Sequence, residues 1–436
     1  MLNLLSDRRF RDCDGTTRRE FLKVGALGAG ALTLPGLLAA RAEAKAAGKP
    51  VKETSVIWLW LAGGPTHVET FDPHMNAPLE YRSTTGEVAT RIPGVTIGGT
   101  FPSIAKMAHR MAIVRSFAHN NSGHVGGTHY VNTGYDNRNI DNGGAPARPS
   151  IGSIVARVRG SNHPHTGMPT YVALTRLRAG IDGSAFLGTA CSPFDPNGQA
   201  LKNLSLAVTE RRVGDRRMLL ASLDRLNSDI DRSGAMEGMD RFEQQAFNLV
   251  MGGAPAAFDL TKESPKTVAK YGKGLGEQLL RARRLCEAGC GFVTLSYNGW
   301  DMHNNIEARM KQISGQVDRG VAALVDDLHR RGLSDQVLVV VTGEFGRTPK
   351  VNKNAGRDHW APLSTLALAG GGLRMGQVVG ESSPKGDVPK STPIRPQDLM
   401  ATVFQVLGID RQTQFTNTAG RPVSMIEDGQ PIAELV

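Results

Sequence analysis

Residues 337–344 have the sequence Val-Leu-Val-Val-Val-Thr-Gly-Glu, which is the strongest structural signal in the chain. The five consecutive aliphatic residues predict a strand that is buried on both faces, as is typical of the centre of a parallel sheet. Glu344 follows this strand after a single glycine. A carboxylate at the end of a buried strand is unfavourable unless it is paired or coordinated. The stretch therefore predicts a parallel sheet with a polar site at one edge.

Other apolar runs extend this prediction to a complete α/β fold. Strands are expected at residues 55–61, 111–117, 170–174, 291–297 and 336–342. Apolar residues spaced among charges predict amphipathic helices at residues 211–232, 238–251, 267–288 and 305–331. Strands that alternate with helices favour a mostly parallel sheet, in which ligands bind beyond the carboxyl ends of the strands.

The composition excludes disorder and gives little support to nucleic-acid binding. Of the 436 residues, 40% are hydrophobic, which is enough for a large core. The formal charge is +10, but the basic residues are scattered, without a run of Lys and Arg interleaved with aromatics. We therefore expect no nucleic-acid partner, and a role that rests on this charge alone is the weakest alternative. Cys286 and Cys290 are expected to be buried and not to form a disulfide.

The N-terminus has the features of an export signal. Arg18 and Arg19 precede an apolar, Gly- and Ala-rich stretch at residues 24–40, and this pattern resembles a twin-arginine (Tat) signal. We expect residues 1–44 to be a signal peptide cleaved after Ala44, or alternatively after Ala42, and residues 45–436 to form one mature domain. The apolar stretch is short and contains a proline, so no permanent membrane span is expected, although an uncleaved anchor is the alternative. The prediction is a bacterial periplasmic or secreted protein that is a substrate of the Tat machinery.

Polar loops follow the predicted strands, at residues 62–73, 119–134, 298–305 and 343–360. Six of the eleven histidines lie in these loops, namely His67, His119, His124, His129, His303 and His359. Imidazole and carboxylate groups are the usual ligands of zinc and other first-row divalent ions. Asp301 and His303 could supply two ligands from one loop, and His359 a third. Glu344 could join the site, or it could form a salt bridge with Arg347 or Arg357.

The same loops offer groups for binding and attacking an anion. Arg347 and Arg357 carry planar guanidinium groups that suit phosphate or sulfate, or they are structural partners of Glu344 and Asp358. Nucleophile candidates next to glycines are Thr66, Ser122, His124 and Thr128. The chain has no GxSxG elbow and no Walker-type GxxxxGK[ST] motif, which argues against a serine hydrolase or a nucleotide kinase.

Four motifs together resemble a known family. They are Gly63-Gly64-Pro65-Thr66-His67, Trp300-Asp301-Met302-His303, Gly343-Glu344-Phe345-Gly346-Arg347-Thr348-Pro349 and Gly356-Arg357-Asp358-His359. They look like the signatures of the DUF1501 family, exported bacterial proteins of unassigned activity that are remote relatives of the alkaline phosphatase and sulfatase superfamily. The resemblance covers nearly the whole mature chain. It implies an alkaline-phosphatase-like three-layer α/β fold, with helices on both sides of a mostly parallel central sheet.

The superfamily resemblance also implies an activity. Its enzymes cleave phosphate or sulfate esters by means of a nucleophile held at a helix start beside one or two metals. Carried over to this chain, Asp301, His303 and His359 look like one metal set, and Glu344 stands where the superfamily has an Asp of a second set. Phe345, however, stands where phosphatases have a histidine ligand.

The nucleophile position and the first loop also depart from the superfamily pattern. His124 occupies the usual nucleophile position, ten residues before Gly134. In the first loop, Thr66 and His67 replace the usual carboxylate. His67 is a further expected metal ligand, and Thr66 a further expected catalytic residue.

The resulting expectation is an exported metal-dependent hydrolase of sulfate or phosphate esters. Its substrate would be a small anionic ester or a sulfated or phosphorylated glycan. Its cofactor would be a divalent metal, zinc in the first place, with calcium or manganese as alternatives. His124 is expected to act as nucleophile or base and Arg347 to hold the anion. Expected substrate-binding residues are Arg357, Asp358, His129 and Trp300. The alternative is a catalytically silent metal- or anion-binding protein of the same fold.

Overall fold

The computed structural model describes residues 53–197 and 254–436. The predicted signal peptide and the predicted helices at 211–232 and 238–251 lie outside the described residues. The chain divides into two units, Met1–Lys52 and Glu53–Val436, and the description below concerns the second. No helix of the described residues is long and apolar enough to cross a membrane.

A seven-stranded sheet forms the centre of this unit, with the order β11-β4-β10-β7-β1-β6-β5. β10 is antiparallel to both of its neighbours, and the other pairs are parallel. The sheet is therefore mostly parallel, as the sequence predicted. Its strands are β1 (Ser55–Ala62), β4 (Ala112–Val114), β5 (Tyr171–Ala173), β6 (Phe292–Asn298), β7 (Val337–Thr342), β10 (Leu366–Gly370) and β11 (Gln377–Val379).

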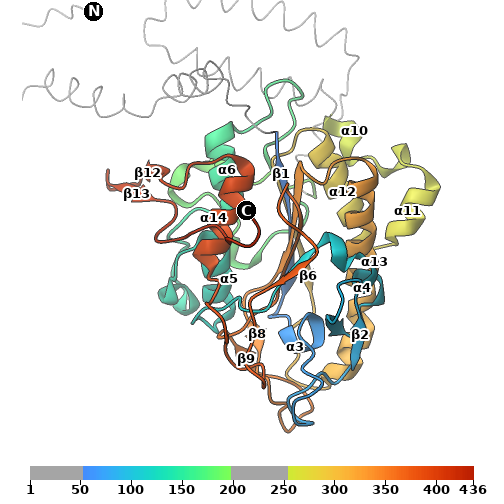
Figure 1. The fold of residues 1–436 in the computed structure, drawn as a ribbon. Coiled ribbons are helices and arrows are strands. Elements are labelled where there is room, and N and C mark those ends of the chain that lie inside the picture. The colour runs from blue at the N-terminus through green and yellow to red at the C-terminus, as the bar shows by residue number, and fades with distance from the viewer. Residues whose placement is uncertain (1–52, 198–253) are drawn as a thin grey trace, which may run out of the picture. The chain divides into compact units, whose positions relative to one another are not determined.

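Helices cover both faces of the sheet, so the unit has three layers (Figure 1). One face packs against α4 (Pro102–Met107), α10 (Ala254–Phe258), α11 (Pro265–Tyr271), α12 (Leu275–Glu287) and α13 (Ile306–Arg330). The opposite face packs against α5 (His124–Thr133), α6 (Ile151–Arg159) and α14 (Pro396–Leu407). The predicted three-layer α/β architecture is thus confirmed.

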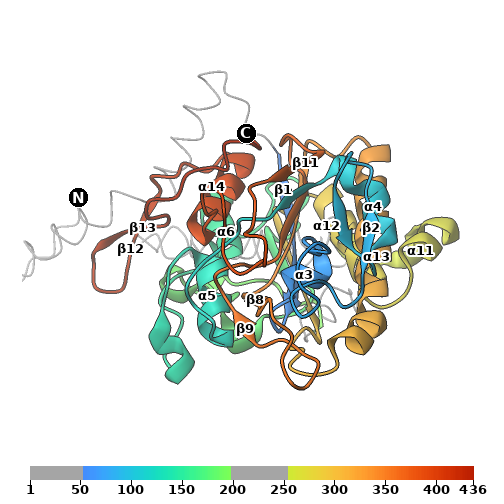
Figure 2. The same ribbon diagram turned by 60° about the horizontal axis from the view of Figure 1, so that its bottom comes forward.

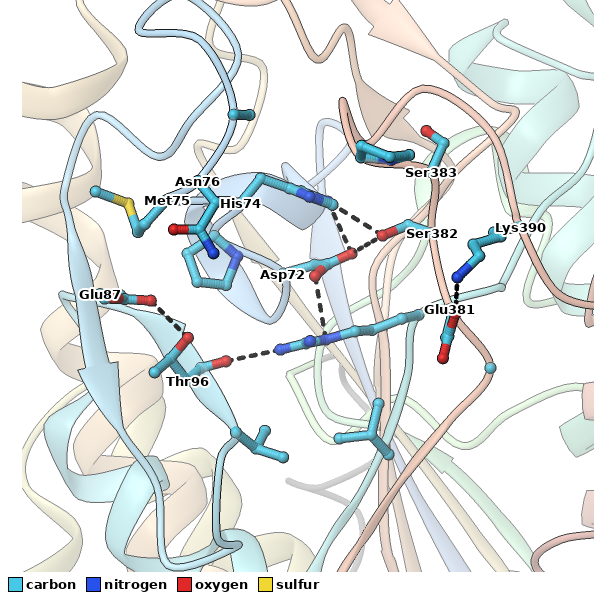
Figure 3. A pocket seen from close by; sticks show the side chains of 17 residues that line it. Asp72, His74, Met75, Asn76, Glu87, Thr96, Glu381, Ser382, Ser383 and Lys390 are labelled. Atoms are coloured by element: carbon cyan, nitrogen blue, oxygen red, sulfur yellow. Dashed lines mark hydrogen bonds and ion pairs between the residues drawn. The ribbon is translucent and has the colours of Figure 1, made fainter.

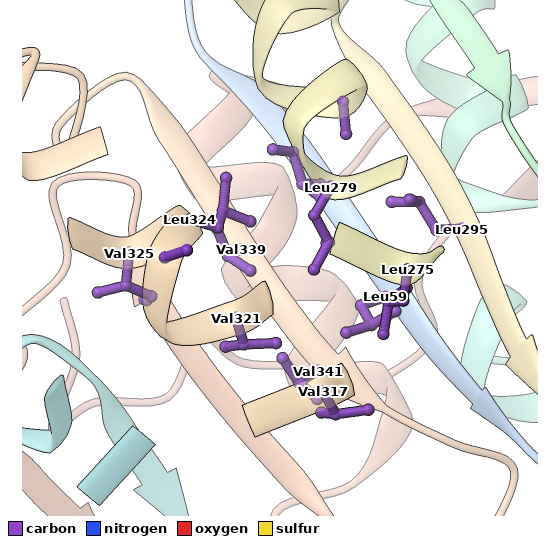
Figure 4. Packing of buried hydrophobic residues seen from close by; sticks show 14 of the residues in the cluster. Leu59, Leu275, Leu279, Leu295, Val317, Val321, Leu324, Val325, Val339 and Val341 are labelled. Carbon is purple, nitrogen blue, oxygen red and sulfur yellow. The ribbon is translucent and has the colours of Figure 1, made fainter. Parts of the chain in front are cut away.

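Alternation along β1 divides the core between the two faces. Successive side chains of a strand point to opposite sides of the sheet. Ile57, Leu59 and Leu61 accordingly join the core under α12 and α13, whereas Val56, Trp58 and Trp60 join the core under α6 and α14. Figure 4 shows the first of these cores, where leucines of α12 and valines of α13 pack onto β1, β6 and β7.

The sequence-based elements differ from the structure in three places. The helix predicted at 267–288 is two helices, α11 and α12, because the chain turns at Gly272 and Gly274, both with positive φ. The loop predicted at 119–134 contains α5. The strands β10 and β11 and the helices α6 and α14 were not predicted. Cys191, Cys286 and Cys290 are buried and free, so the predicted burial of Cys286 and Cys290 is confirmed.

Short elements complete the unit. The hairpins are β2 (Glu87–Ala89) with β3 (Thr96–Gly98), β8 (Gly346–Arg347) with β9 (His359–Trp360), and β12 (Gln414–Thr416) with β13 (Pro422–Ser424). The remaining short helices are α3 (His67–Thr70), η2 (Ala108–Arg110), η3 (Arg138–Asn142), η4 (Arg178–Gly180), η5 (Ala185–Leu187), η6 (Thr189–Cys191) and η7 (Leu260–Lys262). Figure 2 turns the bottom of Figure 1 forward and shows α3, β8 and β9 in front of the sheet. This is the carboxyl edge of β1, β6 and β7.

A buried ion pair fastens the segment before β9 to α3. Arg357 and Glu69 are both fully buried, and Nη2 of Arg357 lies 2.8 Å from Oε1 of Glu69. Thr66 begins α3 and donates its hydroxyl to Oε2 of Glu69 at 2.6 Å. Burial raises the pKa of Glu69, but the charge and hydrogen bonds of Arg357 outweigh burial and hold the pKa below its usual value. Glu69 is therefore ionised at neutral pH and locks the loop after β1 to the loop after β7.

Glu69→Gln should lower the free energy of unfolding at pH 7 by roughly 3–5 kcal/mol, because it leaves the Arg357 charge buried without its partner. The folded-state pKa of Glu69 is depressed, so its ionised form stabilises the wild type above the unfolded pKa of about 4.5. That stabilisation is lost as the pH falls through the folded pKa. Urea titrations should therefore show that the difference in the free energy of unfolding between the variant and the wild type becomes smaller below pH 4.5.

The matched control is Glu307→Gln, which removes an exposed ion pair with Lys311. It should change stability by less than about 1 kcal/mol at any pH. If Glu69→Gln lowered the free energy of unfolding by the same amount in acid as at pH 7, the Glu69–Arg357 ion pair would not have the stabilising role assigned to it.

Candidate functional site

Five predicted site residues meet at the carboxyl edge of the sheet. Asp301 and His303 follow β6, Glu344 follows β7, His359 lies on β9, and His124 is the first residue of α5. Because β6, β1 and β7 are neighbours, the loops that leave them lie side by side. The parallel arrangement thus places these polar groups together although they are up to 235 residues apart in sequence.

Asp301, His303 and His359 present one atom each to a common point. Oδ1 of Asp301 lies 3.0 Å from Nε2 of His303 and 3.4 Å from Nε2 of His359. The two Nε2 atoms are 3.1 Å apart. Ligand atoms bound tetrahedrally to zinc at about 2.05 Å are about 3.3 Å from one another. The three atoms therefore have the spacing of ligands that share one cation.

The other nitrogen of each imidazole is held by an acceptor. Nδ1 of His303 contacts Oδ1 of Asp358 at 2.7 Å, and Nδ1 of His359 contacts the carbonyl oxygen of Ser122 at 3.0 Å. A carboxylate and a carbonyl can only accept, so both Nδ1 atoms carry the proton. When the rings are neutral, each Nε2 carries a lone pair, and Nη1 of Arg347 approaches that of His303 at 3.4 Å. The two Nε2 atoms at 3.1 Å repel each other unless a cation or a proton lies between them.

His124 forms a second pair with Glu344. Its Nδ1 lies 2.9 Å from Oε1 of Glu344, and its Nε2 lies 3.4 Å from Oδ2 of Asp301. Glu344 is fully buried, and Oε1 also accepts the backbone N–H of Gly63 at 2.8 Å. Its Oε2 is buried and has no hydrogen-bond partner. The alternative of a salt bridge from Glu344 to Arg347 or Arg357 does not occur; the partner of Glu344 is His124.

This donor set fits a divalent metal. Besides the contacts above, His124, Asp301 and His359 offer ligand atoms that all lie within 4.8 Å of one another. The second-layer acceptors on Nδ1 are the arrangement that orients histidine ligands in metal sites. Oε2 of Glu344 is a buried acceptor that no donor of the described residues satisfies. The side chain of Asp301 is 46% exposed, so a substrate can reach the site from solvent.

Phe345 forms the apolar back of the site. It is fully buried, and its ring centroid lies 4.4 Å from that of His359 and 5.1 Å from that of His124. The aromatic ring therefore fixes the planes of two imidazoles. It also fills the position at which the resemblance would have required a further histidine ligand.

Arg347 has a different place from the one expected of an anion-binding residue. It is fully buried, and it donates from Nε to the carbonyl of Gly64 at 2.9 Å and from Nη1 to the carbonyl of Arg357 at 3.0 Å. Nη1 also lies 3.4 Å from Nε2 of His303, and Nη2 donates to the carbonyl of Gly63 and to Oδ1 of Asp301. All five N–H groups thus face protein acceptors. Arg347 positions the loops and does not present a free fork to a substrate.

The charge on Asp301 depends on this arginine. Burial raises the pKa of Asp301, but the hydrogen bond and charge of Arg347 outweigh burial, and the pKa falls to about 2. Burial lowers the pKa of His359, and the nearby charges of Arg347 and His124 lower it further. A carboxylate thus lies beside an imidazole whose neutral form is favoured.

Several predicted site residues lie outside the cluster. Thr66 and Arg357 are both buried, and both bind the carboxylate of Glu69. His67 is buried with Nε2 on the carbonyl of Gly386 at 2.8 Å, and burial lowers its pKa to about 4. His129 is buried within α5, and its Nδ1 contacts the carbonyl of Tyr135 at 2.9 Å. Trp300 is buried in the core. Asp358 lies at the site, where it holds His303.

Two supporting groups were missed by sequence reasoning. Ser122 was considered for its hydroxyl, but its backbone carbonyl orients His359. Asn352 donates from Nδ2 to the carbonyl of His303 at 3.1 Å and to Asp358 at 3.3 Å. A backbone carbonyl leaves no trace in residue identity, and Asn352 lies between the motifs 343–349 and 356–359 without belonging to either.

Comparisons with known proteins complete this description. The chain is similar to the PsFucS1 sulfatase from Pseudoalteromonas sp., at 12% identity over 86% of this chain and 71% of that chain, with a TM-score of 0.40. It is similar to the TAB5 alkaline phosphatase at 10% identity over 83% of this chain and 100% of that chain, with a TM-score of 0.37. It is also similar to the phosphonate monoester hydrolase SpPMH from Silicibacter pomeroyi, at 14% identity over 87% of this chain and 76% of that chain, with a TM-score of 0.34. No curated protein matches the sequence. The model of DUF1501, described as a protein of unknown function, matches residues 53–436, and the chain belongs to this family.

Proposed function

We propose that this chain is an exported metal-dependent hydrolase of sulfate or phosphate esters. The observation that supports the proposal most directly is the convergence of Nε2 of His303, Nε2 of His359 and Oδ1 of Asp301 within 3.4 Å of one another. Each histidine has its Nδ1 on an acceptor, and the site opens to solvent.

Asp301, His303 and His359 would hold the metal. Two imidazoles and one carboxylate with an open position favour zinc over calcium, which prefers oxygen ligands. When bound, a divalent metal at this place would polarise an ester oxygen and lower the pKa of a bound water. The remaining steps are assigned to residues of this chain.

His124 would act as the base for the attacking water. Glu344 accepts the Nδ1 proton of His124, which leaves Nε2 free to take a proton and stabilises the imidazolium that forms. His124 is the first residue of α5, a ten-residue helix whose N–H groups at Val125 and Gly126 donate to Asp141. An ester placed between His124 and the proposed metal would therefore lie within reach of the base.

Metal content tests the first part of the proposal. Purified wild type should carry close to one equivalent of a divalent metal by elemental analysis, and His303→Ala and His359→Ala should each lose it, because ligand loss typically weakens zinc binding strongly. His165→Ala removes an exposed histidine and is the control, which should keep the metal. Wild type without stoichiometric metal would rule out a metal-dependent hydrolase.

Turnover separates the hydrolase from the alternative, a silent binding protein. On a panel of aryl sulfate, phosphate and phosphonate esters, His124→Ala should reduce kcat by roughly 10²-fold to 10⁴-fold, the usual contribution of a general base. It should also retain the metal, because Asp301, His303 and His359 remain. Loss of the metal in His124→Ala would instead make His124 a ligand, since it offers a ligand atom within 4.8 Å of those of Asp301 and His359. Metal retention without turnover of any ester by the wild type would favour the silent binding protein instead.

Export can be tested without knowledge of the activity. Arg18→Lys with Arg19→Lys should keep the protein in the cytoplasm, because the resemblance to a Tat signal rests on this adjacent pair. The matched control is Arg8→Lys with Arg9→Lys, a second adjacent pair ahead of the motif. Cell fractionation and immunoblotting would measure both. Equal export of both double variants would contradict a Tat signal.

A further inference from the structure

A cavity of about 620 Å³ lies beyond β4 and β11, and none of the residues of the histidine cluster lines it. One wall is the segment 72–77 after α3, and the other is the segment 380–384 after β11. Arg115, the first residue after β4, lies between them. Figure 3 shows Glu87 and Thr96 on one side of Asp72, with Lys390 and Glu381 on the other.

Asp72 organises the floor of this cavity. It is 6% exposed, and its carboxylate lies 3.2 Å from Nε of Arg115 and 2.9 Å from Nε2 of His74. Ser382 donates its hydroxyl to the same oxygen of Asp72 that contacts His74. Ser382 and His74 therefore converge on one carboxylate oxygen, which is not the linear order of a catalytic triad. Both oxygens of the Asp72 carboxylate have partners, so the floor suits binding more than catalysis.

His74 is held in an uncommon conformation at this place. Its φ is +50°, in the left-handed region that residues other than glycine seldom adopt. Nε2 of His74 also lies 2.7 Å from the point that a Cβ on Gly386 would occupy, so the opposite loop approaches it closely. Such backbone conformations persist where the surroundings fix them, and they concentrate at functional sites.

The charges that line the cavity pair with one another. Asp72 contacts Arg115 and His74, and Glu381 lies 2.7 Å from Lys390. Glu87 accepts a hydrogen bond from Thr96 at 2.6 Å. Three carboxylates disfavour an anion, and Arg115 and Lys390 disfavour a cation. What remains is a wall of donors and acceptors interrupted by Val95, Val378 and Met75, which matches a neutral ligand with several hydroxyl groups and an apolar face.

The loop after β11 links this cavity to the histidine cluster. Its Gly386 accepts a hydrogen bond from His67, and its Asp387 accepts one from Nε1 of Trp360 at 2.7 Å. Trp360 directly follows His359. His67 in turn lies against Gly346, since a Cβ added to Gly346 would be 2.8 Å from Nδ1 of His67. One layer of side chains thus lies between the cavity wall and the strands β8 and β9 of the site.

We propose that this cavity binds an uncharged sugar residue of a sulfated or phosphorylated glycan. The inference rests on the proposed function for the ester, but the binding of the sugar does not require hydrolysis. A sugar site in this cavity favours a glycan over a small ester as the substrate class.

The test measures binding of neutral oligosaccharides directly. The mature protein is titrated with uncharged hexasaccharides of glucose, xylose, mannose and galactose, and saturation-transfer NMR and calorimetry give the Kd. At least one hexasaccharide should bind. Asn76→Ala with Glu87→Ala, two exposed lining residues, should weaken that binding roughly tenfold, as expected for the loss of two hydrogen bonds. Glu80→Ala, an exposed residue near them that does not line the cavity, should leave the Kd unchanged.

The same titration on His303→Ala separates this proposal from the proposed function. That variant should bind the hexasaccharide with the wild-type Kd whether or not the wild type hydrolyses any ester. If no hexasaccharide binds, or if the double variant binds as tightly as the wild type, the sugar site is wrong, and hydrolysis of aryl esters would be unaffected by that result.

Discussion

The buried guanidinium of Arg347 is the group on which the site depends. It contacts the carbonyls of Gly63 and Gly64 after β1, the carboxylate of Asp301 after β6 and the carbonyl of Arg357 before β9. A fully buried guanidinium is unfavourable unless its donors are satisfied, so these segments must close around it. The closure has a steric condition as well. Gly63 has a φ of +119°, and a Cβ there would lie 2.4 Å from the backbone nitrogen of Asp301. Glycine and arginine together therefore set the position of Asp301.

The electrostatic balance of the cluster follows from the same arginine. Three carboxylates, Asp301, Glu344 and Asp358, surround the imidazoles, and Arg347 supplies one formal positive charge. Two formal negative charges remain, which one divalent cation would neutralise. The guanidinium also lowers the pKa of Asp301 to about 2, so Asp301 is ionised at neutral pH. Arg347 thus positions Asp301 and keeps it charged, although it was expected to hold an anion.

The sequence predicted the sheet well because its evidence is local: uninterrupted aliphatic runs such as 337–341 show buried strands without knowledge of the rest of the chain. It missed α5 because Gly126 and Gly127 disfavour a helix, and only the packing of Gly127 against the backbone of Glu344 shows why glycine is there. That Asp301, His303, His359, Glu344 and His124 lie together could be predicted because each belongs to a polar loop after a predicted strand. The places of Thr66 and Arg357 could not be predicted, since their partner Glu69 is set by tertiary packing.

Two residues that differ from what the sequence resemblance implies are in contact with each other. The resemblance implies a nucleophile at the position of His124 and a histidine ligand at the position of Phe345. The Phe345 ring packs against both His124 and His359, so it removes one ligand and orients two imidazoles. Glu344, which would otherwise be free to bind a second cation, gives Oε1 to Nδ1 of His124. The proposed function therefore calls for one cation at Asp301, His303 and His359, with the imidazole of His124 beside it as the base.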